Sequence, residues 1–379
     1  MAEPPTILFA GGGSGGHIFP NLAVIERLFE RRLAFTPRLL VSERVVDREV
    51  AEAAGIAWTA LPATPLRRSL TGGLRFVNNF ANARRAARQL IRDTSHVGAL
   101  VATGGFVSGP AVAAARSLGL PTALVSLDAK AGRANRTMAK RVDVVFAALQ
   151  GGQLKDRTGR DADVVGFPLR YTAVSHLDAS SARAGLGLDA TRRTLLIFAG
   201  SQGATTINEA MAEWMTRTGV AQKFEGWQVL HYAGPGRDDV DSLRAAYERA
   251  GVAAVVEPFG HRMGLGWASA DLAVTRAGAG TVAEAWANAV PTLFLPYPHH
   301  RDQHQRLNAL PLTNAGGAVL LSDRIEPTAN VAEISGPLLE LMHNANQREA
   351  MSRVLRDRPM GDGAARIADW CEARLLARG

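Results

Sequence analysis

The chain has 379 residues, of which 47% are hydrophobic, and it carries a formal net charge of +8. This length corresponds to about two domains, and the apolar content is ample for two cores. The single cysteine, Cys371, excludes a disulfide framework, and we expect it to pack in the last helix of a protein from a reducing cytoplasm. No stretch approaches the roughly 18 apolar residues of a membrane-spanning helix, so we expect a protein that is neither exported nor membrane-spanning.

The excess of basic residues, with a sequence pI of about 10.3, indicates an anionic partner. The sequence has no zinc-ligand spacing, RNA-binding aromatic motif or long basic run, so we do not expect that partner to be nucleic acid. An anionic lipid surface or a substrate with a pyrophosphate group fits the charge better.

The first expected element is a buried strand, Thr6–Ala10, followed by a glycine turn and an amphipathic helix (GGGSGGHIFPNLAVIERL). The turn matches the G-x-G-x-x-G dinucleotide motif from Gly11 onwards, and Glu43 after the next strand could serve as its ribose-binding acid. This pattern alone would favour a nicotinamide-dependent oxidoreductase. The ionisable ring of His17 at the mouth of the turn argues against that function, which stays open as the remote alternative.

Strands and helices alternate through the rest of the N-terminal half, which predicts a doubly wound parallel sheet. The expected strands are residues 37–41, 98–102, 121–124 and 142–146. After the second of these, the segment TGGFVSGP places glycines and Ser108 at a helix start, where backbone N–H groups suit an anion.

Residues 64–90 (TPLRRSLTGGLRFVNNFANARRAARQL) combine apolar and basic side chains. The apolar members are Leu74, Phe76, Val77 and Phe80, and the basic members are Arg67, Arg68, Arg75, Arg84, Arg85 and Arg88. A basic amphipathic helix can lie at a lipid headgroup interface without crossing it, so we expect an anionic membrane contact here. The alternative is an ordinary packed helix with a solvated basic face.

A second alternating series follows the polar, helix-prone stretch that ends near Arg193. Its strands are expected at residues 194–198, at 228–232 and around Val255, and the first of them ends in a further glycine segment, FAGSQGA. The two halves of the chain therefore have like architecture, although no sequence repeat relates them.

The most informative stretch is residues 271–308, which predict a βαβ unit: a strand at 272–274, a glycine turn, a helix opened by Thr281, and a strand at 292–296. Such units bind ligands at the carboxyl end of the first strand. The N–H groups at the helix start suit a diphosphate, and Glu284, expected in the first turn, can accept two hydrogen bonds from a vicinal diol. These features predict a sugar-nucleotide site, unless the stretch is simply a capped helix followed by a solvated loop.

The polar run HHRDQHQRLN at residues 299–308 could supply amide and imidazole groups to hexose hydroxyls, with Asn308 starting the next packed segment. One glycine turn thus carries a histidine and another carries a carboxylate. This pairing suits a transferase that holds two substrates in a cleft.

Five stretches, in the right order, resemble the bacterial N-acetylglucosaminyltransferases that act on lipid-linked muramyl-pentapeptide, the GT-B enzymes of glycosyltransferase family 28 that make lipid II from lipid I. They are GGSGGHIFP (residues 12–20), TGGFVSGP (103–110), GSQGA (200–204), RAGAGTVAE (276–284) and HQRLNALPL (304–312). The combination spans most of the chain and is far more specific than any one stretch.

The resemblance implies a GT-B fold, with two Rossmann-like doubly wound parallel-sheet domains facing a cleft. The expected divisions are residues 1–168, a linker at 169–193, a donor-binding domain at 194–351, and a C-terminal helix at 352–379 that crosses back to the first domain. The implied reaction is inverting transfer of N-acetylglucosamine from its uridine diphosphate donor to undecaprenyl-pyrophosphoryl-muramyl-pentapeptide in peptidoglycan synthesis. The implied location is peripheral, on the cytoplasmic side of the cell inner membrane.

Roles for individual residues follow from the same resemblance. His17 is the candidate general base, unless it caps the turn or binds phosphate. In the donor site, Glu284 would hold the ribose, Ser201 and Arg170 the diphosphate, His304 and Gln305 the sugar, and the backbone around Phe259 and Gly260 the uracil. Further substrate contacts are implied at Ser14, Gly15, Gly16, Asp128, Ala279, Gly280, Thr281, Val282 and Ala283.

The chain departs from the family pattern on the acceptor side. A His-Glu-Gln-Asn run of the family is replaced by Val125, Ser126, Leu127 and Asp128, and Gly-Asn-Pro-Val-Arg becomes residues 166–170, GFPLR. On the donor side, paired glutamines become His304 and Gln305, which keeps a hydrogen-bonding pair. A family member that glycosylates a different lipid or small-molecule acceptor is therefore the main alternative.

We expect neither a cofactor nor an essential metal, because helix N-termini are available for the diphosphate. Paired aspartates that could hold a divalent ion occur twice, as Asp161 with Asp163 and as Asp239 with Asp241. The first pair precedes the linker and the second opens a charged helix, so both are predicted to be solvated faces.

Overall fold

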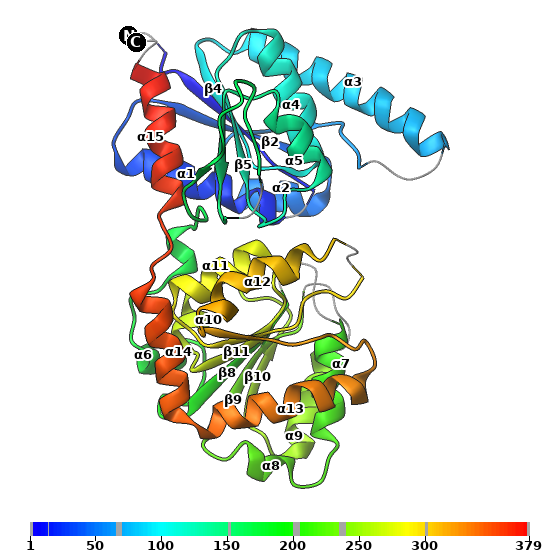
Figure 1. The fold of residues 1–379 in the computed structure, drawn as a ribbon, viewed down its shortest axis with the longest axis vertical. Coiled ribbons are helices and arrows are strands. Elements are labelled where there is room, and N and C mark those ends of the chain that lie inside the picture. The colour runs from blue at the N-terminus through cyan, green and yellow to red at the C-terminus, as the bar shows by residue number, and fades with distance from the viewer. Residues whose placement is uncertain are drawn as a thin grey trace. The chain divides into compact units, whose positions relative to one another are not determined.

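The computed structural model describes residues 3–13, 15–65, 70–150, 153–199, 205–234, 240–299 and 302–376 (Figure 1). The chain divides into two units. The first contains Met1–Arg170 together with Gly361–Gly379, and the second contains Tyr171–Met360.

The first unit is built on a parallel sheet in the order β3-β2-β1-β4-β5-β6-β7. Its strands are β1 (Thr6–Ala10), β2 (Thr36–Ser42), β3 (Trp58–Leu61), β4 (Val97–Ala102), β5 (Thr122–Ser126), β6 (Val144–Ala147) and β7 (Asp163–Val164). Its helices are η1 (Gly15–His17), α1 (Phe19–Glu30), α2 (Val45–Ala53), α3 (Leu70–Asp93), α4 (Gly105–Ser117), α5 (Arg133–Ala139) and α15 (Gly363–Leu376). The strands β1, β4 and β5 are buried throughout, because helices cover both faces of the sheet.

The second unit repeats this plan with the order β10-β9-β8-β11-β12-β13. Its strands are β8 (Arg193–Phe198), β9 (Trp227–Tyr232), β10 (Ala254–Glu257), β11 (Leu272–Thr275), β12 (Thr292–Phe294) and β13 (Ala318–Leu320). Its helices are η2 (Tyr171–Ala173), α6 (Ala179–Ala184), α7 (Thr205–Met215), α8 (Val220–Lys223), α9 (Val240–Ala250), α10 (Met263–Ser269), α11 (Ala279–Ala287), α12 (His304–Asn314), α13 (Pro327–His343) and α14 (Ala345–Asp357). All the strand pairs are parallel, as the alternating pattern predicts.

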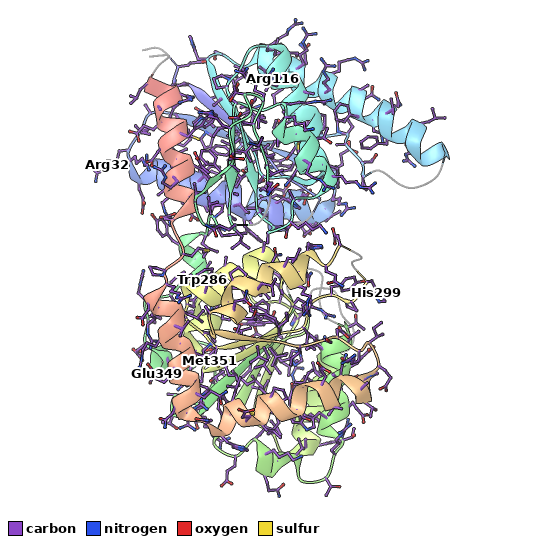
Figure 2. The ribbon with its side chains drawn as sticks, viewed as in Figure 1. Arg32, Arg116, Trp286, His299, Glu349 and Met351 are labelled. Carbon is purple, nitrogen blue, oxygen red and sulfur yellow. The ribbon has the colours of Figure 1, made fainter. Side chains whose placement is uncertain are left out.

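Two segments differ from the divisions expected from the sequence. Residues 171–193, assigned to a linker, belong to the second unit, where α6 packs against α10. The terminal segment forms two helices instead of one: α14 stays in the second unit, and Met351 on it is buried in the core while Glu349 lies at the surface (Figure 2). The second helix, α15, packs against α1 in the first unit, with Cys371 buried.

The long helix α3 has two different halves. Its second half packs on α4 through Ala83, Ala87 and Ile91, whereas its first half extends away from the rest of the first unit (Figure 1). In that first half Leu74 is 76% exposed and Val77 is 65% exposed. The expected basic amphipathic helix is therefore present from Leu70 onward, and part of its apolar face is open to solvent, whereas Arg67 and Arg68 lie outside the described residues.

Candidate active site

In the first unit the strand order reverses between β1 and β4, which lie side by side. Parallel sheets of this kind bind ligands beyond the carboxyl ends of the strands at which the order reverses. The glycine turn with His17 follows β1, and the TGGFVSGP segment follows β4. The fold thus brings together two of the glycine segments that the sequence analysis identified.

A group of polar side chains ties the two segments to each other. The Thr103 hydroxyl donates to the backbone oxygen of His17 at 2.5 Å, and the Asn21 amide donates to Thr103 Oγ1 at 3.1 Å. Ser108, expected at an anion-binding helix start, is instead fully buried, with its hydroxyl 3.0 Å from Ala10 O. A Cβ on Gly11 would lie 2.2 Å from His17 O, so only glycine fits this junction.

The His17 ring lies against the backbone of Gly104, which has a φ of +104°. A Cβ there would be 3.2 Å from Nε2 of His17 and 3.4 Å from Oδ1 of Asn135. Burial lowers the pKa of His17, while the charges of Asp128 and Asp47 oppose that shift. The imidazole is therefore neutral near pH 7, the form in which it can accept a proton.

The carboxylate of Asp47, on α2, holds the glycine turn from inside and was not identified from the sequence. Its Oδ2 accepts a 2.6 Å hydrogen bond from the Gly13 N–H and a further bond from the Ser42 hydroxyl, and the side chain is fully buried. A backbone donor that a nicotinamide dinucleotide would need for its pyrophosphate is thus already paired with an anion. Glu43, the acid that the dinucleotide motif would require, is exposed.

In the second unit the strand order reverses between β8 and β11. The glycine segment after β8, including Ser201, lies outside the described residues, as does Ser14 in the first unit. The segment after β11 is described and leads directly into α11. The donor site predicted from the sequence therefore lies at the crevice position of this sheet.

The helix α11 begins at Ala279, two residues earlier than expected, because the chain is already helical after the extended Gly278. Glu284 consequently lies in the second turn of the helix, not in its first. No side chain caps the N-terminus of α11, so the backbone around Ala279 and Gly280 remains suited to an anion. Val282 is buried, and so is Ala283, so these two predicted contacts have no side chain to offer a ligand.

The carboxylate of Glu284 is held by a tryptophan that the sequence analysis did not single out. Trp267 on α10 donates from Nε1 to Glu284 Oε2 at 2.9 Å. Burial raises the pKa of Glu284 to about 7, although the bond from Trp267 lowers it. The Trp267 indole is buried and packs edge-on against Phe198 at the end of β8.

His304 and Gln305 form the first turn of α12, after a left-handed residue at Gln303. Gln305 Oε1 accepts from the Tyr297 N–H at 2.8 Å, and His304 Nδ1 lies 2.9 Å from Asp302 Oδ1. Farther along the helix, the buried Asn308 amide donates to Ala277 O at 3.3 Å. This last bond joins the α12 start to the turn before α11, and so places both predicted donor segments at one edge of the sheet.

Matches to family models decide which family this geometry belongs to. The model of the glycosyltransferase family 28 N-terminal domain matches residues 7–147, and that of the C-terminal domain matches residues 194–367. The chain belongs to glycosyltransferase family 28. It is 36% identical to a UDP-N-acetylglucosamine–N-acetylmuramyl-(pentapeptide) pyrophosphoryl-undecaprenol N-acetylglucosamine transferase of Acidothermus cellulolyticus, with 98% of each chain covered. It is 35% identical to the protein of the same name from Corynebacterium efficiens, over 97% of this chain and 96% of that one.

Solved structures agree with the family 28 assignment at the level of the fold. The crystal structure of Acinetobacter baumannii MurG superposes with a TM-score of 0.70 at 23% identity, covering 98% of this chain and 99% of that chain. A UDP-glucosyltransferase from Polygonum tinctorium superposes with a TM-score of 0.69 at 16% identity, covering 99% of each chain. The two doubly wound parallel-sheet domains are therefore those of a GT-B glycosyltransferase, and the predicted fold class is confirmed.

Other predicted residues of this family 28 chain have structural partners of their own. Arg170, expected at the diphosphate, forms a 2.7 Å ion pair with Glu26 on α1. Gly260 is buried, and a Cβ on it would lie 2.7 Å from the Tyr232 ring. Phe259 beside it is 36% exposed.

The aspartate pairs considered for a metal are only partly described. Asp161 pairs with Lys155 at 3.2 Å, and Asp241 pairs with Arg244 at 2.5 Å. Asp239 lies outside the described residues.

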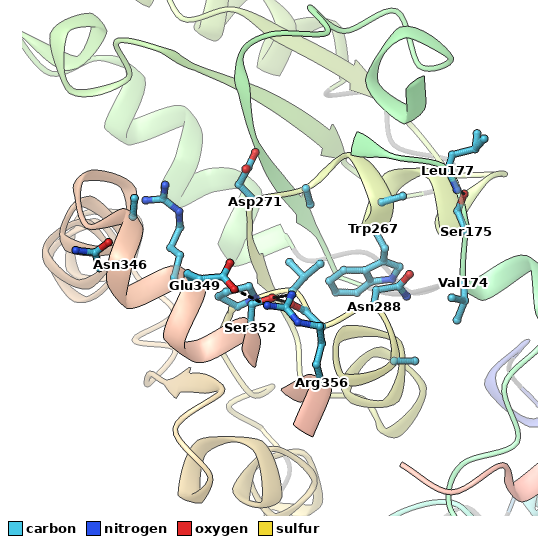
Figure 3. Close-up of a pocket in the computed structure, with 18 residues that line it drawn as sticks. Val174, Ser175, Leu177, Trp267, Asp271, Asn288, Asn346, Glu349, Ser352 and Arg356 are labelled. Carbon is cyan, nitrogen blue, oxygen red and sulfur yellow. Dashed lines mark hydrogen bonds and ion pairs between the residues drawn. The ribbon is translucent and has the colours of Figure 1, made fainter. Parts of the chain in front are cut away.

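A cavity of about 720 Å³ lies at the opposite edge of the second sheet, where β11 and β12 begin (Figure 3). Its lining includes Asp271 and Pro291, which precede β11 and β12, together with Ser352 and Arg356 of α14. The segments of the predicted donor site follow these strands instead of preceding them. This cavity is therefore separate from the predicted donor site, although Trp267 borders it.

Within the described ranges, no helix is both long and apolar enough to cross a membrane.

Proposed function

We propose that the chain transfers N-acetylglucosamine from UDP-N-acetylglucosamine to undecaprenyl-pyrophosphoryl-N-acetylmuramyl-pentapeptide, with inversion at the anomeric carbon. The observation that carries this proposal is the match, over nearly the full length of both chains, to relatives named for that reaction. The two crevice positions, one with a neutral histidine and one with a helix N-terminus and a carboxylate, support it chemically.

The donor would bind at the carboxyl edge of the second sheet. The N-terminus of α11 presents backbone N–H groups to the diphosphate, with Ser201 as a further contact. The ionised Glu284 accepts hydrogen bonds from the ribose hydroxyls, and the backbone of Gly260 meets the uracil. His304 and Gln305 contact the hexose.

The acceptor hydroxyl would react at the carboxyl edge of the first sheet. His17 takes the hydroxyl proton while the hydroxyl oxygen forms a bond to the anomeric carbon. The bond from that carbon to the diphosphate breaks on the opposite face, and the electron pair leaves with UDP. The resulting imidazolium would be stabilised by the charges of Asp128 and Asp47, which act on His17 in the free protein.

The altered acceptor segment favours one second candidate, transfer to a different acceptor. Val125 and Leu127 are buried, so those two departures from the family pattern are absorbed into the core. Asp128 is partly exposed and replaces a neutral asparagine of the pattern. Among these changed residues, Asp128 is therefore the one that could contact an acceptor different from that of the relatives.

We infer a peripheral location on the cytoplasmic face of the membrane, and the open half of α3 supports the contact with a membrane surface. Its exposed Leu74 and Val77 lie beside the exposed Arg75, a combination that suits an anionic headgroup region. A lipid-linked acceptor would then be reached from the bilayer surface.

The reaction is tested with purified protein, UDP-N-acetylglucosamine and lipid I, and the product is identified as lipid II by mass. Formation of lipid II at a rate far above that of donor hydrolysis supports the proposal. Donor turnover that lipid I does not accelerate, but another acceptor does, would favour the second candidate.

A further inference from the structure

One buried ion pair lies beneath the predicted donor site. Arg276, the first residue after β11, places Nη1 2.5 Å from Asp323 Oδ2, in the segment after β13. The side chain of Arg276 is 6% exposed and that of Asp323 is 0% exposed. Neither charge therefore serves as a surface group.

The pair connects four segments at the carboxyl edge of the second sheet. Arg276 also donates from Nη2 to the Thr206 hydroxyl on α7 at 2.7 Å, and from Nη1 to Leu295 O, after β12, at 2.9 Å. Asp323 accepts from Thr206 at 2.5 Å and, on Oδ1, from the Asn330 amide of α13 at 3.0 Å. The segments that follow β8, β11, β12 and β13 are thus joined around one guanidinium.

The contacts continue from this pair toward the predicted sugar contact. The Arg276 guanidinium lies over the Tyr297 ring, 5.6 Å from its centroid. The Tyr297 N–H in turn donates to Gln305 Oε1 at 2.8 Å. Movement of Arg276 would therefore displace the segment that carries Gln305.

Desolvating two charges is costly, and a buried ion pair is often no more stabilising than a hydrophobic pair of similar volume. The hydrogen bonds at both carboxylate oxygens of Asp323 and at both terminal nitrogens of Arg276 offset that cost. They also give the pair one geometry, because a guanidinium donates in fixed directions. Such a pair suits the placement of loops better than it suits direct contact with a ligand.

We propose that Arg276 and Asp323 are a positioning pair, which fixes the α11 start and the Tyr297–Gln305 segment in the geometry that binds the sugar nucleotide. The inference rests on the proposed function, since it assigns the donor to this edge. In this arrangement Arg276 influences donor binding through the residues that it contacts. Its guanidinium forms an ion pair with Asp323 and does not contact the diphosphate.

The test compares Asp323→Asn with a matched variant at Asp271, which lies at the opposite end of β11 from Arg276. Asp271, just before β11, accepts from Arg183 at 2.7 Å and from the Thr194 N–H at 2.8 Å, at the edge opposite the donor site. Asp271→Asn therefore removes an Arg-paired carboxylate charge from the same sheet without touching the donor segments. Thr206→Val provides a milder third variant, which keeps both charges and removes only the bridging hydroxyl.

Dissociation constants for UDP-N-acetylglucosamine and for UDP are measured by calorimetry, and thermal midpoints are recorded for each variant. Asp323→Asn should weaken UDP-N-acetylglucosamine binding about tenfold or more, as expected for loss of a charge-assisted bond. Thr206→Val should weaken it less, and UDP should lose less than the sugar nucleotide. Asp271→Asn should lower the thermal midpoint and leave both dissociation constants unchanged.

Three outcomes would overturn the proposal. Unchanged binding by Asp323→Asn would show that the pair does not position the donor site, and tighter binding would make Arg276 a direct ligand that Asp323 restrains. If Asp271→Asn loses as much affinity as Asp323→Asn, the loss in both variants is explained by general destabilisation of the second unit. Absence of UDP-N-acetylglucosamine binding by the wild-type protein would overturn the proposed function as well, whereas the other two outcomes leave that function standing.

Discussion

The Trp267 indole donates a 2.9 Å hydrogen bond to the carboxylate of Glu284, and both groups belong to the second unit. Burial nevertheless raises the pKa of Glu284 to about 7, from an ordinary value of 4.5. The protein thus keeps the Glu284 carboxyl group in surroundings that disfavour its ionised form. Such shifted pKa values are common at ligand-binding and catalytic sites.

Glu284→Gln should weaken UDP binding and stabilise the free protein at the same time. Removing one partner of a charge-assisted hydrogen bond costs roughly 1.5–3 kcal/mol, so the dissociation constant should rise about tenfold or more. Because folding raises the pKa of Glu284, the native state loses stability as pH rises from about 4.5 to about 7. The glutamine variant does not ionise, so it does not lose this stability. The gain should be roughly 1–3 kcal/mol above pH 7.

Calorimetry and thermal unfolding at about pH 4.5 and about pH 8 measure the two effects of Glu284→Gln. The stability difference from wild type should appear only at the higher pH. An unchanged dissociation constant for UDP would remove Glu284 from the donor site, whatever the stability shows.

Trp267→Phe should move the pH dependence of donor binding. Wild-type affinity should fall as pH drops through about 7, because the protonated Glu284 loses its charge. The bond from Trp267 lowers that pKa, so its removal should shift the midpoint to higher pH. Donor dissociation constants between about pH 5.5 and about pH 8.5 give both midpoints. If the dissociation constants of the two proteins depend on pH in the same way, Trp267 does not influence donor binding through Glu284.

Sequence patterns located the strands that helices bury on both faces, such as β1, whose predicted bounds match those observed. Three short edge strands, β3, β7 and β13, were not predicted, because none of them is buried throughout and so none has a continuous buried apolar run. The sequence analysis also did not identify residues whose role depends on a contact with a distant part of the chain. Asp47 and Gly13 are 34 positions apart in the sequence, and Arg276 and Asp323 are 47 positions apart. No local sequence pattern therefore predicts either contact.

The glycine segments were found because glycine is required locally. His17 and Thr103 could be assigned to one edge, since parallel strands present their carboxyl ends together. The position of the α11 start could not be fixed in the same way, because helix boundaries depend on caps that a glycine-rich turn lacks.

Asp47→Ala should loosen the first glycine turn more than Asp47→Asn does. Asparagine keeps an oxygen for the Gly13 N–H, whereas alanine leaves that buried donor without its partner. The expected loss of stability for alanine is roughly 1–3 kcal/mol, measured by urea unfolding. Equal stability of the two variants would show that the hydrogen bond to Gly13 contributes little.

Replacing Leu74 and Val77 by serine should reduce binding to anionic vesicles without loss of stability, since both side chains are mostly exposed. Phe80 is unsuitable for this test, because its ring lies within 3.2 Å of the Cβ position of Gly109 on α4 and packs there. Leu376→Ser, at a leucine that is 69% exposed on α15, is the matched control and should bind vesicles like wild type. Cosedimentation measures the difference, and equal binding by all three proteins would place the membrane contact elsewhere.

His17→Ala should lower the turnover number by about 10²–10⁴-fold and leave the donor dissociation constant nearly unchanged, because a general base acts only in the transition state. In the wild type, turnover should fall as pH drops through the pKa of His17, which burial places below 6.5. Asp128→Asn should shift this fall to still lower pH, because the Asp128 charge raises that pKa. A histidine that only binds phosphate or holds the turn would instead raise a Michaelis constant, with turnover at saturation preserved. Steady-state kinetics with both substrates varied separates the two, and near-wild-type turnover of His17→Ala at saturation would exclude the ring as the base.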